Sequence, residues 1–200
     1  MLTDLPNLLT LSRIAAIPVL VVLVALRSPA GDLAACAVFA FAGVTDWLDG
    51  RIARNRQQIS DLGRMLDPIA DKLLVGASLM VLAGGDRLTR FGLYPAIVIL
   101  LREILVSGLR EYLAGLSVGL PVTRLAKWKT GFQMTALGML LAGDSGAALI
   151  HLGFLPVHLL GEIMLWVAAV LTLITGWDYL MAGLHHVSAA TPARPGPARR

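Results

Sequence analysis

Six long apolar stretches constrain this chain more than any other feature of its sequence. They cover residues 8–27, 33–54, 63–84, 91–115, 125–142 and 157–182. A helix of about 20 apolar residues spans the roughly 30 Å hydrocarbon core of a bilayer. A helix is also one of the few structures that satisfies its own backbone hydrogen bonds there. The pattern therefore predicts an all-α, polytopic membrane protein with six transmembrane helices.

Composition agrees with a bilayer as the solvent. Only 15% of the residues are charged and 56% are hydrophobic, whereas a soluble domain carries roughly 25% charged residues. Short polar or glycine-containing linkers separate the apolar stretches, including one at residues 143–146. We interpret residues 1–183 as one transmembrane domain. Residues 184–200, rich in Ala, Pro and Arg, are expected to form a disordered cytoplasmic tail.

The basic residues predict the orientation of the six spans. Lys and Arg concentrate in the connection between spans two and three, in that between spans four and five, and in the tail. Loops rich in Lys and Arg stay on the cytoplasmic side, so both termini are expected there, in a multi-pass protein of the cell (inner) membrane. Bases at span ends suit anionic lipid headgroups and phosphate substrates rather than nucleic acid.

Four aspartates lie where an apolar span should exclude charge. Asp46 and Asp49 are three residues apart near the cytoplasmic end of span two, and Asp67 and Asp71 are four apart near the same end of span three. Each spacing places the pair on one helix face. Charged residues inside membrane spans are costly and usually functional. The sequence therefore predicts that the two pairs converge.

Converging carboxylates repel one another unless cations lie between them. Oxygen ligands favour Mg²⁺ or Mn²⁺, and two such ions can clamp a diphosphate. Gly50 and Gly63 leave space on these helix faces, and Arg54 is positioned to reach phosphate oxygens. The competing interpretation is structural: the aspartates cap helices or pair with neighbouring arginines.

The same segment carries a specific motif. It reads Asp46-x2-Asp49-Gly50-x2-Ala53-Arg54-x8-Gly63-x3-Asp67-x3-Asp71. This string resembles the complete signature of the CDP-alcohol phosphotransferase family, at every defined position.

The resemblance implies a six-helix, often dimeric membrane enzyme with its active site at the cytoplasmic face. It implies that Asp46, Asp49 and Asp67 bind metal, while Asp71 binds metal and acts as general base. It also implies contacts of Gly50 and Arg54 with the CDP group, with Ser60 near the diphosphate.

Flanking blocks resemble the branch of the family that joins CDP-diacylglycerol to sn-glycerol 3-phosphate. They include residues 6–13, 101–104 and 127–130. An acceptor that carries its own phosphate needs a second basic site. The candidates in spans four and five are Arg110, Lys127, Lys129 and Arg102. Alternatively, the lysines anchor a helix end and the arginines pair with Glu103 or Glu111.

At the N-terminus, Asn7, Thr10 and Arg13 are spaced to form a polar stripe near the nucleotide. Equally, Asn7 caps the first helix and Arg13 extends toward the interface.

Other functions stay open at this stage. The same chemistry can use inositol phosphate, serine, or phosphatidylglycerol (which gives cardiolipin) as acceptor. A small cation transporter also uses intramembrane carboxylates, but the acidic residues lie near one face and no repeat is evident. A catalytically inactive lipid-binding relative is the third alternative.

Overall fold

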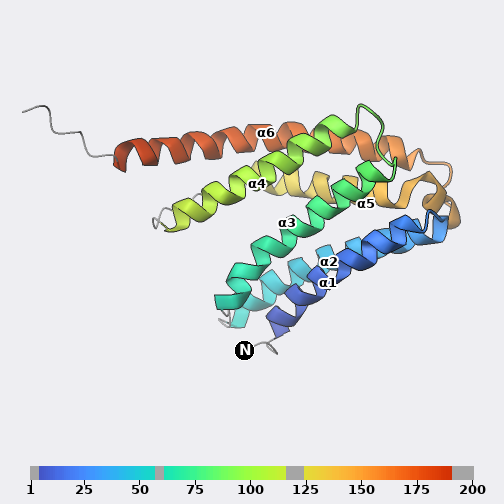
Figure 1. Ribbon diagram of the computed structural model, residues 1–200, viewed down its shortest axis with the longest axis horizontal. Helices are drawn as coiled ribbons and strands as arrows, with labels where there is room; N and C mark the ends of the chain where they lie inside the picture. The colour runs from blue at the N-terminus through green and yellow to red at the C-terminus, as the bar shows by residue number, and fades with distance from the viewer. Residues whose placement is uncertain (1–4, 57–60, 116–123, 191–200) are drawn as a thin grey trace, which may run out of the picture.

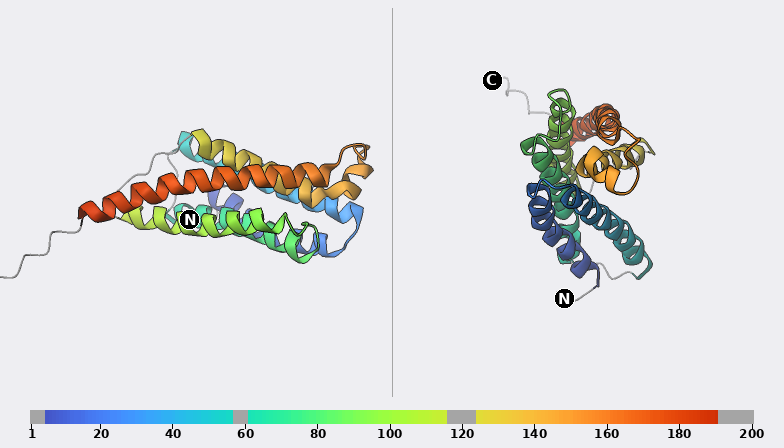
Figure 2. Two further views of the ribbon diagram at one scale, coloured as in Figure 1. Left: turned by 90° about the horizontal axis from the view of Figure 1, so that it is seen from above. Right: turned by 90° about the vertical axis from the view of Figure 1, so that its right-hand side faces the viewer.

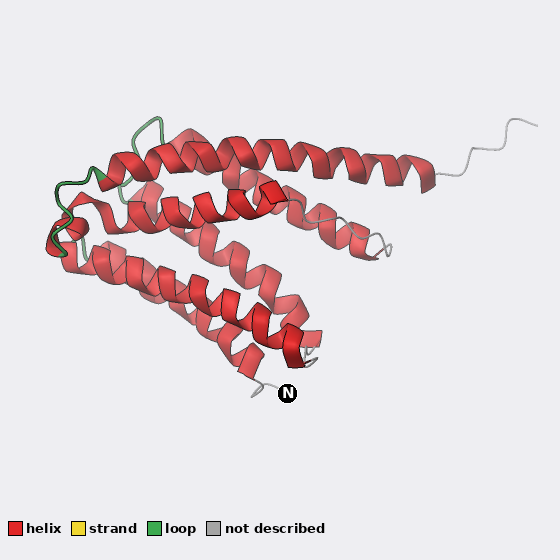
Figure 3. Cartoon of the chain, turned by 180° about the vertical axis from the view of Figure 1, so that it is seen from behind, coloured by secondary structure: helices red, strands yellow, loops and turns green. Residues whose placement is uncertain are grey.

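The computed structural model describes residues 5–56, 61–115 and 124–190, with side chains described outside residues 5–7, 47–56, 61–65, 178 and 182–190. Within these residues all regular structure is helical (Figure 3). The helices are α1 Leu5–Ala25, α2 Pro29–Arg56, α3 Asp61–Gly84, α4 Leu93–Gly115, α5 Arg124–Leu149 and α6 Val157–Ala190.

Apart from residues 26–27 and 91–92, the predicted apolar stretches lie in these helices. This agreement confirms the all-α class. The six helices run along the long axis of the molecule (Figures 1 and 2). At the end where α1 begins, α1, α2 and α3 diverge from α4 and α6 (Figure 1). At the opposite end the two groups meet, so the bundle has an open end and a closed end.

The core lies between the two groups of helices. Leu20 of α1, Phe39 of α2, Leu82 of α3, Ile99 of α4 and Leu140 of α5 are buried in one cluster. Leu165 of α6 completes the cluster. Because every helix contributes an apolar face to it, burial of this surface holds the six helices in one bundle.

The outer surface is also apolar. Phe41, Met80, Leu101 and Trp177 are each more than 60% exposed although they are large and hydrophobic. Water disfavours such a surface, whereas lipid does not. Two segments, Leu8–Ala25 and Val157–Met181, are long and apolar enough to cross a membrane unaided. All six helices carry at least one charged residue, including Arg13 in α1 and Glu162 in α6.

Three predicted boundaries are wrong. We expected a linker at residues 143–146, but α5 continues to Leu149 and only Gly143 leaves helical geometry, at φ 59° and ψ 178°. The predicted linker before span two is shorter, because α2 already begins at Pro29. The tail expected from residue 184 is helical as far as Ala190, where α6 ends. Residues 191–200 lie outside the described part.

Polar side chains join the helices at the closed end. Arg87 donates two hydrogen bonds to the buried carboxylate of Asp32, at 2.7 and 2.8 Å. Ser145 donates to the same carboxylate at 3.3 Å. Glu162 accepts hydrogen bonds from the backbone N–H and the hydroxyl of Thr89. The closed end is therefore held together by contacts among α2, α5, α6 and the α3–α4 loop. The helices diverge at the other end.

Candidate active site at the open end

Three of the four predicted aspartates have described side chains, and they converge as expected. Asp46 lies on α2, and Asp67 and Asp71 lie one turn apart on α3. The carboxylates of Asp67 and Asp71 lie close enough to Asp46 for their charges to repel it. Asp46 and Asp71 remain 52% and 43% exposed at their side chains. They are therefore accessible to a ligand.

The first helix contacts this carboxylate cluster directly. Arg13 forms an ion pair with Asp46 at 2.6 Å, and the Thr10 hydroxyl donates a hydrogen bond to Asp67. Both α1 side chains are almost completely buried, at 2% and 1% exposure. Two of the three residues in the polar stripe predicted on the first span, Thr10 and Arg13, therefore face the aspartates. These contacts reach Oδ1 of Asp46 and Oδ1 of Asp67.

Several predicted site residues lie outside the described side chains. Ser60 lies outside the described residues altogether. The others belong to α1, α2 or α3 by their backbone: Asn7, Asp49, Gly50, Arg54 and Gly63. Their roles in binding metal and the CDP-lipid stay predictions.

The donor chemistry of the cluster fits a hard divalent cation. Mg²⁺ usually binds through one or two carboxylates together with substrate phosphates, and Asp46, Asp67 and Asp71 supply only oxygen donors. Among the described side chains, no three acidic, His or Cys groups approach closely enough to enclose an ion by themselves. Asp49 would be the fourth ligand of the predicted set, and its side chain lies outside the described part. Substrate phosphates would complete the coordination.

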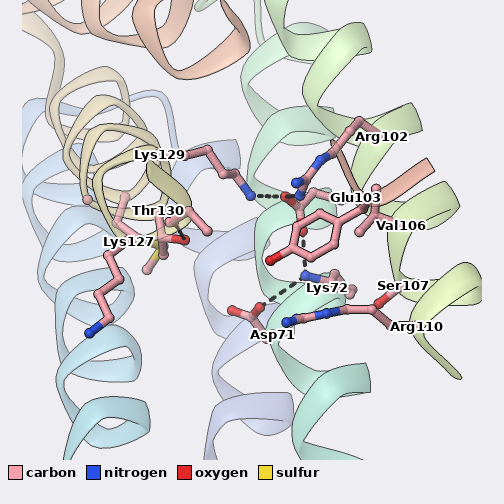
Figure 4. Close-up of a pocket in the computed structure, with 14 residues that line it drawn as sticks. Asp71, Lys72, Arg102, Glu103, Val106, Ser107, Arg110, Lys127, Lys129 and Thr130 are labelled. Carbon is pink, nitrogen blue, oxygen red and sulfur yellow. Dashed lines mark hydrogen bonds and ion pairs between the residues drawn. The ribbon is translucent and has the colours of Figure 1, made fainter. Parts of the chain in front are cut away.

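A cavity of about 480 Å³ adjoins the aspartates. Asp71 and Lys72 line it from α3, and basic residues line it from α4 and α5 (Figure 4). All four predicted acceptor residues are in its wall: Arg102, Arg110, Lys127 and Lys129. The general-base candidate and the anion-binding candidates thus share one cavity.

The basic residues of the cavity fall into two groups, those that pair with Glu103 and those that do not. The buried carboxylate of Glu103 accepts hydrogen bonds from Lys72 of α3 and Lys129 of α5, and it pairs with Arg102 at 3.3 Å. Lys72 also lies 3.4 Å from Asp71. One acidic residue therefore connects α3, α4 and α5 beside the general-base candidate, and its charge offsets cations that would otherwise repel one another.

Arg110 and Lys127 form the second group. Both are exposed, and neither makes a hydrogen bond or ion pair with the described part of the chain. Their N–H donors are available to an anion in the cavity. By contrast, Lys129 is 5% exposed and bonded to Glu103, and Arg102 donates to Thr175 of α6 at 2.9 Å. Arg110 and Lys127 are therefore the more accessible of the four bases that line the cavity.

Sequence reasoning considered Glu103 only as an alternative partner of the arginines, and the structure shows that pairing with Arg102; it assigned no role to Tyr179. The only signal for Glu103 was an acidic residue next to Arg102 in an apolar span. Tyr179 follows Thr175 by four residues in α6, and this spacing places both on one helix face. The sequence could not show that this face meets α4.

The fold and site define a class of protein: a helical bundle with an apolar outer surface, in which a carboxylate cluster adjoins a basic cavity. Comparison with known sequences identifies the family. Residues 3–174 match the CDP-alcohol phosphatidyltransferase family, and the chain belongs to it. Enzymes of this family are embedded in membranes, synthesise lipids and generally use divalent metal ions.

Two bacterial relatives resemble the chain over most of their length, and both are named CDP-diacylglycerol–glycerol-3-phosphate 3-phosphatidyltransferase. The Rickettsia bellii protein is 46% identical over 90% of this chain and 94% of its own length. The Bacillus subtilis protein is 37% identical, over 88% and 93% respectively. A rice protein named cardiolipin synthase (CMP-forming) is 38% identical over 82% of this chain but only 55% of its own length.

Proposed function

We propose that this chain transfers the phosphatidyl group from CDP-diacylglycerol to sn-glycerol 3-phosphate, releasing CMP and forming phosphatidylglycerophosphate. The observation that carries the proposal is the position of Asp71. It belongs to the carboxylate cluster and also lines the basic cavity. A base placed there can reach the hydroxyl of an acceptor whose phosphate occupies the cavity.

The proposed step is a single displacement at phosphorus. A terminal hydroxyl of glycerol 3-phosphate loses its proton to Asp71 as its oxygen bonds to the phosphorus nearest the lipid. The bond from that phosphorus to the CMP oxygen breaks, and CMP leaves. Arg110 and Lys127 hold the acceptor phosphate, with Lys129 and Arg102 behind them. This arrangement orients the hydroxyl toward Asp71.

A divalent metal would neutralise the diphosphate and stabilise the leaving CMP. We propose Mg²⁺ or Mn²⁺, with two ions by analogy with related chemistry. Asp46, Asp49, Asp67 and Asp71 would hold the metal. Arg13 and Thr10 fix the carboxylates of Asp46 and Asp67 from α1. In this proposal the CDP-lipid lies over Asn7, Thr10, Gly50, Arg54, Ser60 and Gly63.

The charge of the cavity supports a phosphomonoester as the acceptor. Five cationic side chains and two carboxylates line it. A phosphomonoester carries about two negative charges near neutral pH, whereas the phosphodiester of phosphatidylglycerol carries one. Inositol phosphate meets the same charge requirement. The names of the bacterial relatives favour glycerol 3-phosphate, and the rice relative keeps phosphatidylglycerol as the second candidate. Family membership argues against the cation transporter.

In the proposed topology all six helices span the inner membrane, with both termini and the open end on the cytoplasmic side. The open end carries the basic residues of α4 and α5, in accordance with the positive-inside rule. A homodimer within the membrane is proposed on the family resemblance. Labelling of single cysteines placed near each terminus, in a variant lacking Cys36, tests the orientation. Protection of either terminus from a cytoplasmic reagent would contradict it.

The function is tested with purified protein, radiolabelled CDP-diacylglycerol and Mg²⁺. Glycerol 3-phosphate, inositol phosphate, serine and phosphatidylglycerol are offered in parallel. We expect glycerol 3-phosphate to be preferred, and a chelator to abolish transfer until Mg²⁺ or Mn²⁺ is restored. Preference for another acceptor would contradict the proposal.

The mechanism is tested with Asp71→Asn, which removes the base and is expected to lower turnover by at least about 100-fold. Asp144→Asn is the matched control, because Asp144 lies at the closed end, where it accepts a hydrogen bond from the backbone N–H of His158. Near-normal turnover of Asp71→Asn would exclude it as the base.

A further inference from the structure

Tyr179 of α6 lies beneath two arginines of α4. The ring centroid is 5.2 Å from the guanidinium carbon of Arg110 and 5.8 Å from that of Arg102. Both distances are within the range of cation–π attraction, about 6 Å. The tyrosine is only 6% exposed, and the ring lines the basic cavity. Arg102 and Arg110 both extend toward this cavity from α4 (Figure 4).

The surrounding face of α6 is shaped to receive α4. Thr175 accepts the hydrogen bond from Arg102. A Cβ at Gly176 would lie 3.2 Å from Cγ and 3.3 Å from Nε of Arg102, closer than most Cβ contacts. Glycine at this position lets the arginine lie across the helix. Tyr179, one turn beyond Thr175, continues the same face toward Arg110.

The two arginines differ in what else holds them. Arg102 is bonded to Thr175 and paired with Glu103. Arg110 makes no hydrogen bond or ion pair with any residue that the structure describes, but its guanidinium contacts the Tyr179 ring. A ring face attracts a cation without using its N–H donors. The donors of Arg110 therefore stay available to a ligand.

We propose that Tyr179 is a positioning residue for the acceptor: its ring holds the Arg110 guanidinium at the cavity so that Arg110 binds the acceptor phosphate. This inference rests on the proposed function for the identity of the acceptor. It assigns α6 a part in substrate selection that neither the aspartate signature nor the basic residues of α4 and α5 indicate. The requirement is for an aromatic face, so phenylalanine should substitute.

The test compares Tyr179→Leu and Tyr179→Phe in the full-length protein. Loss of the ring is expected to raise KM for glycerol 3-phosphate by about 3-fold to 30-fold, as expected for loss of a cation–π contact. KM for CDP-diacylglycerol should stay within about twofold of the wild-type value, because CDP-diacylglycerol binds elsewhere in the proposed site. Tyr179→Phe should retain most of the wild-type affinity. Tyr179→Met replaces the leucine variant if that protein does not fold.

A double-mutant cycle separates positioning from a general structural effect. In an Arg110→Gln background, Tyr179→Leu should raise KM for the acceptor no further, because the side chain it positions is gone. Additive effects of the two substitutions would overturn the inference. So would equal increases in KM for both substrates, or a Tyr179→Phe variant as impaired as the leucine variant.

Binding of inorganic phosphate, measured by calorimetry without any lipid substrate, keeps this test independent of turnover. We expect Tyr179→Leu to weaken phosphate binding and Tyr179→Phe to preserve it. If wild-type protein transfers nothing to glycerol 3-phosphate but phosphate binding still depends on the ring, the proposed function fails and the positioning role stands. If transfer occurs and neither KM nor phosphate binding depends on the ring, the positioning role fails alone.

Discussion

The guanidinium of Arg13 on α1 lies 2.6 Å from a carboxylate oxygen of Asp46 on α2, and the arginine is buried while half of the aspartate side chain is exposed. This asymmetry suggests what the pair does. A buried cation fixes one oxygen of Asp46 and reduces the repulsion among the aspartates. The exposed part of the carboxylate remains open toward the ligand. In the proposed site, the ion pair therefore orients Asp46 toward the metal in addition to joining two helices.

The first prediction follows from this pair. Arg13→Met keeps an apolar stem of similar length and removes the charge. Because water can solvate the half-exposed Asp46, the free energy of unfolding should fall by no more than about 1–2 kcal/mol. Turnover should fall about tenfold or more, because Asp46 loses its orientation.

Turnover at saturating metal, together with thermal unfolding in detergent, measures both effects. Arg13→Lys, which keeps the charge, should recover part of the activity. A variant that loses stability in proportion to activity would show that the pair is only structural.

The second prediction concerns the buried carboxylate of Glu103. Glu103→Gln keeps the size of the side chain but leaves Lys129 without its counter-charge and leaves Lys72 with only Asp71, 3.4 Å away. Breaking a buried pair costs about 3–5 kcal/mol, and we expect the lower end because Lys72 is 31% exposed at its side chain. Thermal unfolding measures the loss.

Two further variants identify the cause of that loss. Glu111→Gln removes an exposed carboxylate from the same helix and should leave stability almost unchanged. Adding Lys129→Met to Glu103→Gln removes the buried lysine that has lost its partner and should restore part of the stability. If the added substitution destabilises the protein further, unpaired charge is not the cause.

Gly143 illustrates how much of the fold the sequence could predict. The lengths of the apolar stretches located all six helices, because a bilayer core dictates their span. The run Gly143-Asp144-Ser145-Gly146 has the composition of a turn, yet only its first residue leaves the helix. Tertiary partners explain the rest: Asp144 accepts the His158 N–H and Ser145 donates to Asp32. Local sequence does not contain those partners.

The candidate site, like the fold, could be predicted from the sequence only in part. Helical spacing and a shared side of the membrane were enough to predict that Asp46, Asp67 and Asp71 converge. The basic residues were also located, but their separate roles depended on Glu103, which binds Lys129 and leaves Lys127 open. Which face of α4 meets α5 and α6 is decided by packing of three helices. No spacing within one helix reveals it.

The third prediction tests the backbone at Gly143. Its φ of 59° and ψ of 178° belong to a region that essentially only glycine occupies. A Cβ there would meet Arg87 at 3.6 Å, an ordinary contact, so the cost of Gly143→Ala is backbone strain. We expect a loss of about 1–3 kcal/mol in the free energy of unfolding.

Gly138→Ala is the matched control on the same helix, because Gly138 is helical and a Cβ there meets no described atom within 4 Å. It should stabilise the protein by about 0.5–1 kcal/mol. Equal unfolding temperatures for the two alanine variants would contradict the assigned backbone geometry.

The fourth prediction compares two lysines of α5 that sequence alone could not separate. Lys127 is exposed at the cavity, whereas Lys129 is buried and bonded to Glu103. Lys127→Gln should raise KM for glycerol 3-phosphate about tenfold, as expected for loss of a charge-assisted hydrogen bond, with no change in unfolding temperature. Lys129→Gln should lower the unfolding temperature, because it unbalances the buried ion network.

Each variant therefore serves as the control for the other, with KM and unfolding temperature measured on both. The opposite pattern, a stable Lys129→Gln with poor acceptor affinity beside a destabilised Lys127→Gln, would reverse the assignment. It would mean that Glu103 releases Lys129 when the acceptor binds. In that case the acceptor phosphate competes with a buried carboxylate for the same cation, and affinity for the acceptor should rise in Glu103→Gln.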